Sequence, residues 1–200
     1  MLHYDSVPSS VAELLKALAG HAGLDGFALG GGTNLALRLG HRVSVDLDWF
    51  TLNEFKVGNL RSVLGGLGTE VAKAAGALTL DVEGTKMDLL RHAYPLVAPL
   101  EEIDCVAMLS LEDVAAMKLN AVANRGSKKD FYDLHELLNH RPLEAWVECF
   151  VTKYQASDPF TVIRSLTWFE DADSEPDPIS LRKLSWSEVR SRITTAVREL

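Results

Sequence analysis

The residues best suited to chemistry are two aspartates separated by one residue, Asp46 and Asp48, within residues 43–50. Alternating polar and apolar residues predict a β-strand here, and side chains at i and i+2 of a strand share a face. Two carboxylates roughly 6.5–7 Å apart along a strand repel each other unless a cation joins them. Because carboxylate oxygens are preferred ligands of divalent cations, the pair indicates a metal site. A half-buried strand with a polar solvent face would produce the same pattern.

A glycine-rich turn precedes the aspartate pair. Residues 26–30 are predicted to form a short strand that runs into Gly30, Gly31 and Gly32, and residues 33–39 a helix. Glycine lets a backbone approach a ligand closely, and the free N–H groups of a helix N-terminus attract phosphate. The turn lacks the GK[ST] of a Walker A loop and the GxGxxG of dinucleotide-binding folds. It therefore indicates either a phosphate-binding loop or a tight strand-to-helix connection.

Asp88 is a third acid, on a later predicted strand. Residues 70–90 are predicted to form two or three strands with turns near Gly76 and Gly84. Asp88 falls on the opposite face from Met87 and is isolated in an apolar strand, which makes it a candidate third metal ligand. The polar residues of the preceding strand alternate with leucines and valine, so we interpret them as a solvent-facing edge.

The C-terminal half supplies a lysine and two further acids. Lys118 lies within the apolar stripe of a predicted helix, so it either extends to solvent or meets an anion. Asp130 and Asp133 follow at i, i+3 on the next predicted helix. They either pair with nearby basic residues or orient Lys118 or a substrate hydroxyl. His41 and Arg42, directly before the aspartate pair, are predicted to contact phosphate or a carboxylate.

These residues must be positioned by an α+β half followed by a helical half. Capping signals predict helices that begin near residues 9, 110, 142, 158 and 185. We place the boundary after residue 107, with a core over residues 1–107 and a helical lobe over residues 108–200. Residues 170–177 hold five acids and no base, which predicts a solvated acidic loop.

Composition limits the class of protein. The 200 residues are 47% hydrophobic and 24% charged, which is typical of a globular chain with a sizeable core. A net charge of −8 argues against retention on nucleic acid or anionic membrane by overall charge, although a local basic groove stays compatible with it. Cys105 and Cys149 show no zinc or disulfide spacing, and no apolar run is long enough to cross a membrane. We expect a cytoplasmic protein without a membrane partner.

Together these motifs resemble those of the nucleotidyltransferase superfamily with a polymerase-β-like core, which has a GG[ST] loop, a paired acid and a third acid on a later strand. More narrowly, three stretches are similar to the AbiEii/AbiGii family, the nucleotidyltransferase toxins of type IV toxin–antitoxin systems. They are GGGTNLALRLGHRVSVDLDWF, TKMDLL and SLEDVAAMKLNAVANRGSKKDFYDLHELL. The resemblance implies an α+β fold, in which a mixed sheet with helices precedes a helical C-terminal lobe.

The resemblance also implies roles for individual residues. Phosphate or nucleotide contacts are expected from Gly31, Gly32, Thr33, Arg42, Ser44 and Lys118. Ligands of Mg²⁺ (or Mn²⁺) are expected at Asp46, Asp48 and Asp88. These three acids form the expected catalytic set together with Lys118 and Asp130.

The implied activity is metal-dependent transfer of a nucleoside monophosphate from an NTP to an acceptor hydroxyl, with release of pyrophosphate. In the resembled family the acceptor can be an RNA 3′ end such as that of tRNA. A protein acceptor and a neighbouring antitoxin without a stable direct complex complete the expected partners. Three alternatives stay open on the same residues: a nucleotide-binding module without turnover, a transferase of the γ-phosphate, and purely structural ion pairs.

Overall fold

The computed structural model describes residues 2–200, and the strands among them form one seven-stranded mixed sheet in the order β3-β4-β5-β2-β1-β7-β6. The strands are β1 (Ala28–Leu29), β2 (Leu47–Thr51), β3 (Thr69–Ala74), β4 (Ala77–Val82), β5 (Thr85–Arg91), β6 (Glu101–Ile103) and β7 (Val106–Met108). At the centre, β2 runs parallel to β5 and antiparallel to β1. The mixed sheet confirms the predicted α+β class.

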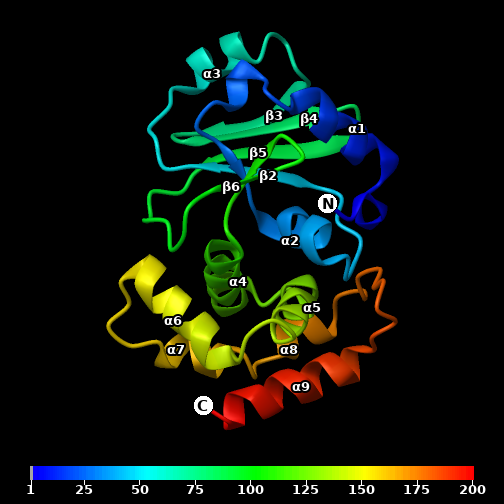
Figure 1. Ribbon diagram of the computed structural model, residues 1–200, viewed down its shortest axis with the longest axis vertical. Helices are drawn as coiled ribbons and strands as arrows, with labels where there is room; N and C mark the ends of the chain where they lie inside the picture. Colours follow the sequence, from blue (N-terminus) through cyan, green and yellow to red (C-terminus); the bar gives the residue numbers. More distant parts are fainter. Residues whose placement is uncertain (1) are drawn as a thin grey trace.

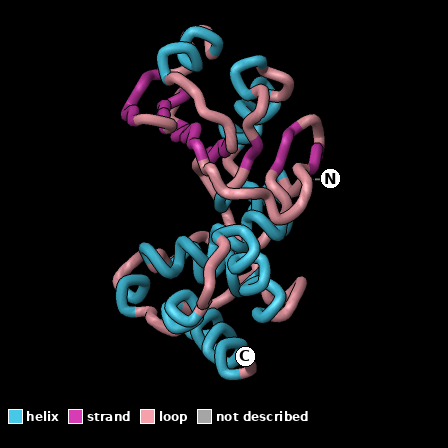
Figure 2. The backbone as a smooth tube through the Cα atoms, turned by 90° about the vertical axis from the view of Figure 1, so that its left-hand side faces the viewer, coloured by secondary structure: helices cyan, strands magenta, loops and turns pink. Residues whose placement is uncertain are grey.

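The helices divide between the two sides of the sheet and a separate helical lobe. They are α1 (Ser9–Leu18), α2 (Gly31–Leu39), α3 (Val57–Val63), α4 (Leu111–Arg125), α5 (Lys128–Leu137), α6 (Leu143–Tyr154), α7 (Phe160–Ser165), α8 (Glu170–Asp173) and α9 (Trp186–Arg198). Figure 1 shows α1 and α3 on one side of the sheet and α2 on the other, where α2 lies between the sheet and the lobe; α4 is the helix of the lobe nearest the sheet. In Figure 2 the strands occupy one end of the molecule and the other end is helical. None of the helices within residues 2–200 has the length and apolar character needed to span a membrane.

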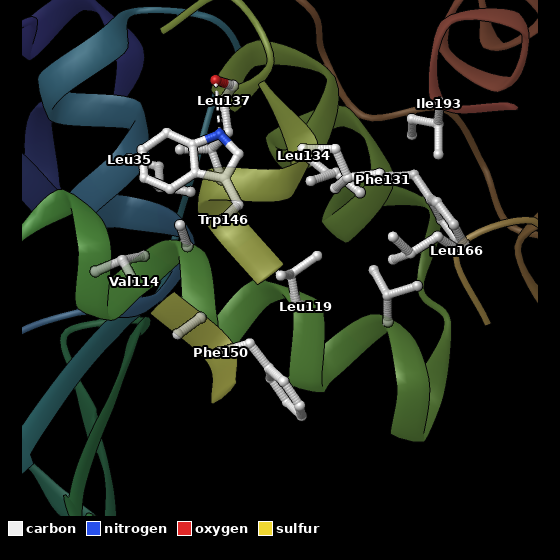
Figure 3. Close-up of a cluster of buried hydrophobic side chains, with 14 of the residues drawn as sticks. Leu35, Val114, Leu119, Phe131, Leu134, Leu137, Trp146, Phe150, Leu166 and Ile193 are labelled. Carbon is white, nitrogen blue, oxygen red and sulfur yellow. Dashed lines mark hydrogen bonds between the residues drawn. The ribbon is translucent and has the colours of Figure 1, made fainter. Parts of the chain in front are cut away.

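Two clusters of buried apolar side chains hold these layers together. One joins α1 and α3 to the sheet face that carries Leu47 and Trp49. The other fills the helical lobe around Trp146, whose indole N–H donates to the Leu137 carbonyl at 3.1 Å (Figure 3). Leu35 on α2 belongs to this second cluster, so α2 packs on the lobe as well as on the sheet. The boundary after residue 107 stays a prediction.

Local capping explains where the two long helices of the lobe begin. The Ser110 hydroxyl accepts the N–H of Asp113 at 3.0 Å and starts α4. Ser185 and Glu188 form a reciprocal capping box at α9. Each satisfies N–H groups that the first helical turn leaves free. Both predicted starts are confirmed.

The predicted strand over residues 43–50 is wrong in its first half, because β2 begins only at Leu47. The preceding residues pair instead with distant segments: the N–H of Val43 donates to the Ile179 carbonyl at 2.8 Å, and that of Ser44 to the Ser6 carbonyl at 2.9 Å. Val45 is consequently 52% exposed rather than part of the core. Asp46 therefore lies in an irregular lead-in to β2.

The hairpin of β6 and β7 was not predicted, because its turn lacks the usual glycine signal. The turn residues Asp104 and Cys105 both have positive φ, at 52° and 62°. Two-residue hairpin turns need this geometry, and glycine or asparagine normally supplies it.

The acidic segment predicted over residues 170–177 is largely exposed to solvent, as expected, but only part of it is a loop. Residues 170–173 form α8, and the Glu175 carboxylate accepts the Ser127 hydroxyl and the Lys128 N–H, each at 2.8 Å. Asp177 forms an ion pair with Lys128 at 3.0 Å. Negative charge is favourable at the positive end of a helix dipole, so these acids stabilise the start of α5.

Candidate active site

Three predicted acids line one cavity between the sheet, the N-terminus of α2 and α4. Asp48 on β2 is the register partner of Asp88 on β5, and Asp46 lies two residues earlier in the lead-in. The cavity measures about 340 Å³. It is also lined by the predicted residues Gly31, Gly32, Arg42, Ser44 and Lys118.

The glycines of the turn are needed for close approach to charged side chains. Gly31 has a φ of +64°, and a Cβ atom there would collide with the Asp48 carboxylate. A Cβ atom at Gly32 would collide with the guanidinium of Arg42. Only glycine allows the helix to begin this near to the two side chains. The N-terminal N–H groups of α2 therefore lie beside the acids.

The acids differ in how the protein neutralises them. Asp88 has partners of its own: Lys86 Nζ lies 2.5 Å from Oδ2, and the Thr79 hydroxyl donates to Oδ1 at 2.6 Å. The pKa of Asp48 is raised, first by burial and then by the charges of Asp88 and Asp46, against the opposing effect of Lys118. Asp48 is thus an acid whose charge the fold leaves incompletely balanced.

The unequal neutralisation of the three acids indicates which of them could bind a metal ion. Within residues 2–200, no three acidic, histidine or cysteine side chains converge on one point. Asp46 and Asp48 nevertheless offer the oxygen ligands that Mg²⁺ prefers, and a cation there would relieve the unfavourable charge of Asp48. The residues present therefore fit a divalent cation at the aspartate pair. A metal role for Asp88 stays a prediction.

A buried cluster of charges fixes Lys118 and Arg42 at the cavity wall. Lys118 Nζ lies 2.8 Å from Asp130 Oδ1 and 2.7 Å from Asp133 Oδ2. Asp133 also accepts from Arg42 Nε at 2.6 Å and contacts His41 Nε2 at 2.7 Å. Lys118 therefore does not extend to solvent; it meets anions, the carboxylates of Asp130 and Asp133. His41 and Arg42 are likewise partners of a carboxylate.

The members of this cluster keep one another ionised. Burial alone would raise the pKa of Asp133, but Arg42, Lys118 and His41 hold it well below its ordinary value. Burial would lower the pKa of Lys118, yet Asp133 and Asp130 raise it. Arg125 adds two hydrogen bonds to Asp130, at 2.8 and 2.9 Å. Arg42 and Lys118 therefore present fixed positive charge at the cavity, while the acids that pair with them, Asp130 and Asp133, lie outside its lining.

Two predicted site residues do not reach the cavity. Thr33 is buried; its hydroxyl donates to the Asp46 carbonyl and lies 2.8 Å from Ser44 Oγ, from which it can accept a hydrogen bond. It fixes the lead-in that carries Asp46 and does not line the cavity, and its phosphate contact stays a prediction. Asp130 lies fully buried behind Lys118, so it positions that lysine.

Lys86 and Phe50 are among the lining residues that sequence reasoning missed. Both lie two residues from a predicted acid on the same strand, Lys86 before Asp88 and Phe50 after Asp48. The i, i+2 rule that paired the acids would also have found these neighbours.

The fold defines a class of protein that solved structures share. JHP933 from Helicobacter pylori matches with a TM-score of 0.60 and 16% identity, over 97% of this chain and 93% of that one. MenT4, a nucleotidyltransferase toxin from Mycobacterium tuberculosis H37Rv, matches with a TM-score of 0.65 and 16% identity, over 95% and 82%. At this identity the likeness shows a common fold, that of a nucleotidyltransferase toxin.

Sequence comparison gives the family. The model for the family "Nucleotidyl transferase AbiEii toxin, Type IV TA system" matches residues 13–97 and 91–199. The chain therefore belongs to the AbiEii family and is a nucleotidyltransferase, as its motifs predicted. The uncharacterized protein aq_aa25 of Aquifex aeolicus (strain VF5) is 34% identical over 158 residues, which are 74% of this chain and 76% of that protein.

Proposed function

We propose that this nucleotidyltransferase moves a nucleoside monophosphate from an NTP to a hydroxyl at an RNA 3′ end, such as that of tRNA, in the cytoplasm. The observation that carries the proposal is the cavity in which Asp46, Asp48 and Asp88 face the glycine turn and Lys118. In keeping with the type IV family, an antitoxin encoded nearby opposes it without a stable direct complex. A protein acceptor is the alternative that the test below includes.

The proposed cofactor is Mg²⁺ (or Mn²⁺), held by Asp46 and Asp48 with Asp88 as third ligand. When bound, it neutralises phosphate charge and stabilises the departing pyrophosphate. The support for this assignment is the raised pKa of Asp48: burial, Asp88 and Asp46 disfavour its charge, and a cation at the pair would stabilise it.

The chain's own residues orient the reaction. Gly31 and Gly32 present the N–H groups of α2 to the triphosphate, and Lys118 with Arg42 supplies fixed positive charge for the leaving group. The acceptor oxygen attacks the α-phosphorus while the bond to the oxygen bridging the β-phosphorus breaks. Pyrophosphate leaves with that electron pair, and the acceptor's proton passes to Asp88.

The direct test is an incorporation assay. The protein is incubated with Mg²⁺, total RNA or total protein, and each of the four NTPs labelled on either the α- or the γ-phosphate. We expect the α label on RNA and an equal release of pyrophosphate. Transfer of the γ label, label on protein alone, or NTP binding by calorimetry without pyrophosphate would each contradict the proposal.

The site assignment is tested by the double variant D46N/D48N, with D81N as matched control because Asp81 is an exposed acid of β4. Loss of the charge-stabilising pair should lower incorporation by about 10²–10³-fold or more, as for other groups that stabilise a transition state. D81N should retain full activity. Equal incorporation by all three proteins would show that the acids are not the catalytic set.

A further inference from the structure

An aromatic cluster adjoins the cavity at Phe50. The Phe50 ring lines the cavity and lies edge-to-face with His92, with ring centroids 5.8 Å apart. His92 in turn lies 4.9 Å from Tyr94 and 6.0 Å from Tyr154, and the two tyrosine rings are 4.7 Å apart. Tyr94 remains 44% exposed. The rings therefore form a continuous series of contacts from Phe50 in the cavity wall to the exposed Tyr94.

The position of this cluster complements the phosphate-facing end of the cavity. Phe50 follows Asp48 by two residues on the same face of β2, whereas Ser44 and Asp46 precede it. The aromatic rings consequently lie beyond the acids, at the opposite end from Ser44. A nucleotide whose phosphates face the glycine turn and the acids needs an apolar, planar surface for its base, and this end supplies one.

The segment that carries the exposed ring is held rigidly. The N–H of His92 donates to the Thr51 carbonyl at 2.8 Å, and Lys153 Nζ donates to the Pro95 carbonyl at 3.2 Å. Asp113 pairs with Lys153 at 2.6 Å and accepts two further backbone N–H groups of the segment. Both charged side chains are buried. An irregular segment that exposes a tyrosine is thus preorganised, which lowers the entropy cost of binding.

His92 adds a polar atom to the aromatic surface. Its Nε2 is buried and has no hydrogen-bond partner within residues 2–200. A buried polar atom without a partner is unfavourable, so a ligand that supplies a hydrogen bond is favoured. Nucleobases combine a planar face with donors and acceptors on their edges.

We infer that His92, Tyr94 and Tyr154 form a stacking subsite for a nucleobase, an inference that rests on the proposed transferase function. The base belongs either to the incoming NTP or to the terminal nucleotide of the acceptor, since both present the same planar chemistry. Stacking on aromatic side chains contributes about 1–3 kcal/mol per base, equivalent to roughly 5- to 150-fold in affinity.

Kinetics of Tyr94→Ala and Tyr94→Phe separate the two sources. In the Ala variant, KM for one substrate should be about 5- to 150-fold higher than in the wild type, with kcat changed far less. In the Phe variant, KM should be close to the wild-type value. A rise in KM for the NTP assigns the subsite to the incoming base, and a rise in KM for RNA assigns it to the acceptor. Unchanged KM values for both substrates would overturn the inference.

A binding assay tests the subsite without turnover. Tyr94→Trp places an indole in the cluster, and Phe160→Trp is the matched control because Phe160 on α7 is 62% exposed and lies outside it. The four NTPs, the four RNA homohexamers and an abasic hexamer serve as probes. We expect quenching of the Tyr94→Trp fluorescence only by base-bearing probes. Equal quenching in the control, or by the abasic hexamer, would refute stacking.

The two proposals can fail separately. Selective quenching without pyrophosphate release from any NTP would support the subsite and reject the transferase. Pyrophosphate release that D46N/D48N abolishes, together with wild-type KM values in Tyr94→Ala, would support the transferase and reject the subsite.

Discussion

At the scale of single residues, Asp133 is the counter-charge shared by two cationic side chains, Arg42 and Lys118, and it also contacts His41. Removing one partner from a buried charge network leaves the others unpaired, which costs about 3–5 kcal/mol. We expect Asp133→Asn to lower the free energy of unfolding in urea by about 3 kcal/mol. Asp177→Asn removes a 59% exposed carboxylate and should change it by less than about 1 kcal/mol. Similar losses in both variants would contradict the role given to Asp133.

The same cluster predicts sensitivity to acid. The pKa of Asp133 lies well below its ordinary value of 3.8, because its cationic partners outweigh the effect of burial. An acid with a depressed folded pKa adds stability above its unfolded pKa and loses it as the pH falls through the folded value. The unfolding free energy of the wild type should therefore fall below pH 4 more steeply than that of Asp133→Asn. Urea titrations at pH 7, 5, 4 and 3 measure this difference, and parallel curves would contradict it.

Substitution of Asp48 should change the free energy of unfolding in the opposite direction from substitution of Asp133. Burial and the charges of Asp88 and Asp46 raise its pKa, and an acid with a raised folded pKa destabilises the fold at pH values above it. Asp48→Asn should increase the unfolding free energy at pH 7 by about 0.5–2 kcal/mol in metal-free buffer, while turnover is lost. Urea denaturation with EDTA, beside Asp81→Asn, tests this. A destabilised Asp48→Asn protein would show that its carboxylate has a structural role instead.

At the scale of elements, the start of α2 depends on Gly31, which lies against Asp48, one of the proposed catalytic acids. Gly31 and Gly20 have similar positive φ values, +64° and +70°, but only Gly31 has a side chain in the path of an added Cβ. Gly20→Ala should therefore lower the free energy of unfolding by about 1–2 kcal/mol, the cost of the left-handed backbone, and leave turnover unchanged. Gly31→Ala should also displace Asp48 and lower turnover by about 10²-fold. Pyrophosphate release and urea denaturation separate the two effects, and equal turnover in both variants would contradict the assigned contact.

The elements also show what a sequence can predict. Ser110 and Ser185 cap helices through residues only three positions away, so both starts were predicted. The paired acids were found because they lie only two residues apart in the chain, although Asp46 precedes β2 rather than belonging to it. In contrast, the Arg42–Asp133 contact spans 91 residues, and chain spacing carries no sign of it. The late start of β2 was missed for the same reason, since Ser44 pairs with distant Ser6.

At the scale of the whole molecule, the chain returns from the helical lobe to the catalytic core. The carbonyl of Ile179 accepts the Val43 N–H, and the Leu181 N–H donates to the His41 carbonyl, each at 2.8 Å. These two bonds flank Arg42 on both sides. Nearby, Arg182 donates to the Leu39 carbonyl of α2 at 2.7 Å. The C-terminal segment thus holds the backbone that carries a cavity arginine, and it couples stability of the lobe to the site.

Leu181→Pro tests this coupling, because proline removes the N–H that reaches His41. We expect a loss of about 1–3 kcal/mol in unfolding free energy from the unpaired His41 carbonyl. The freed backbone loosens Arg42, so KM for the NTP should rise more than kcat falls. Leu181→Ala is the matched control: it truncates a side chain that is 40% exposed but keeps the N–H. If both variants changed KM equally, the side chain rather than the backbone contact would join the C-terminal segment to the site.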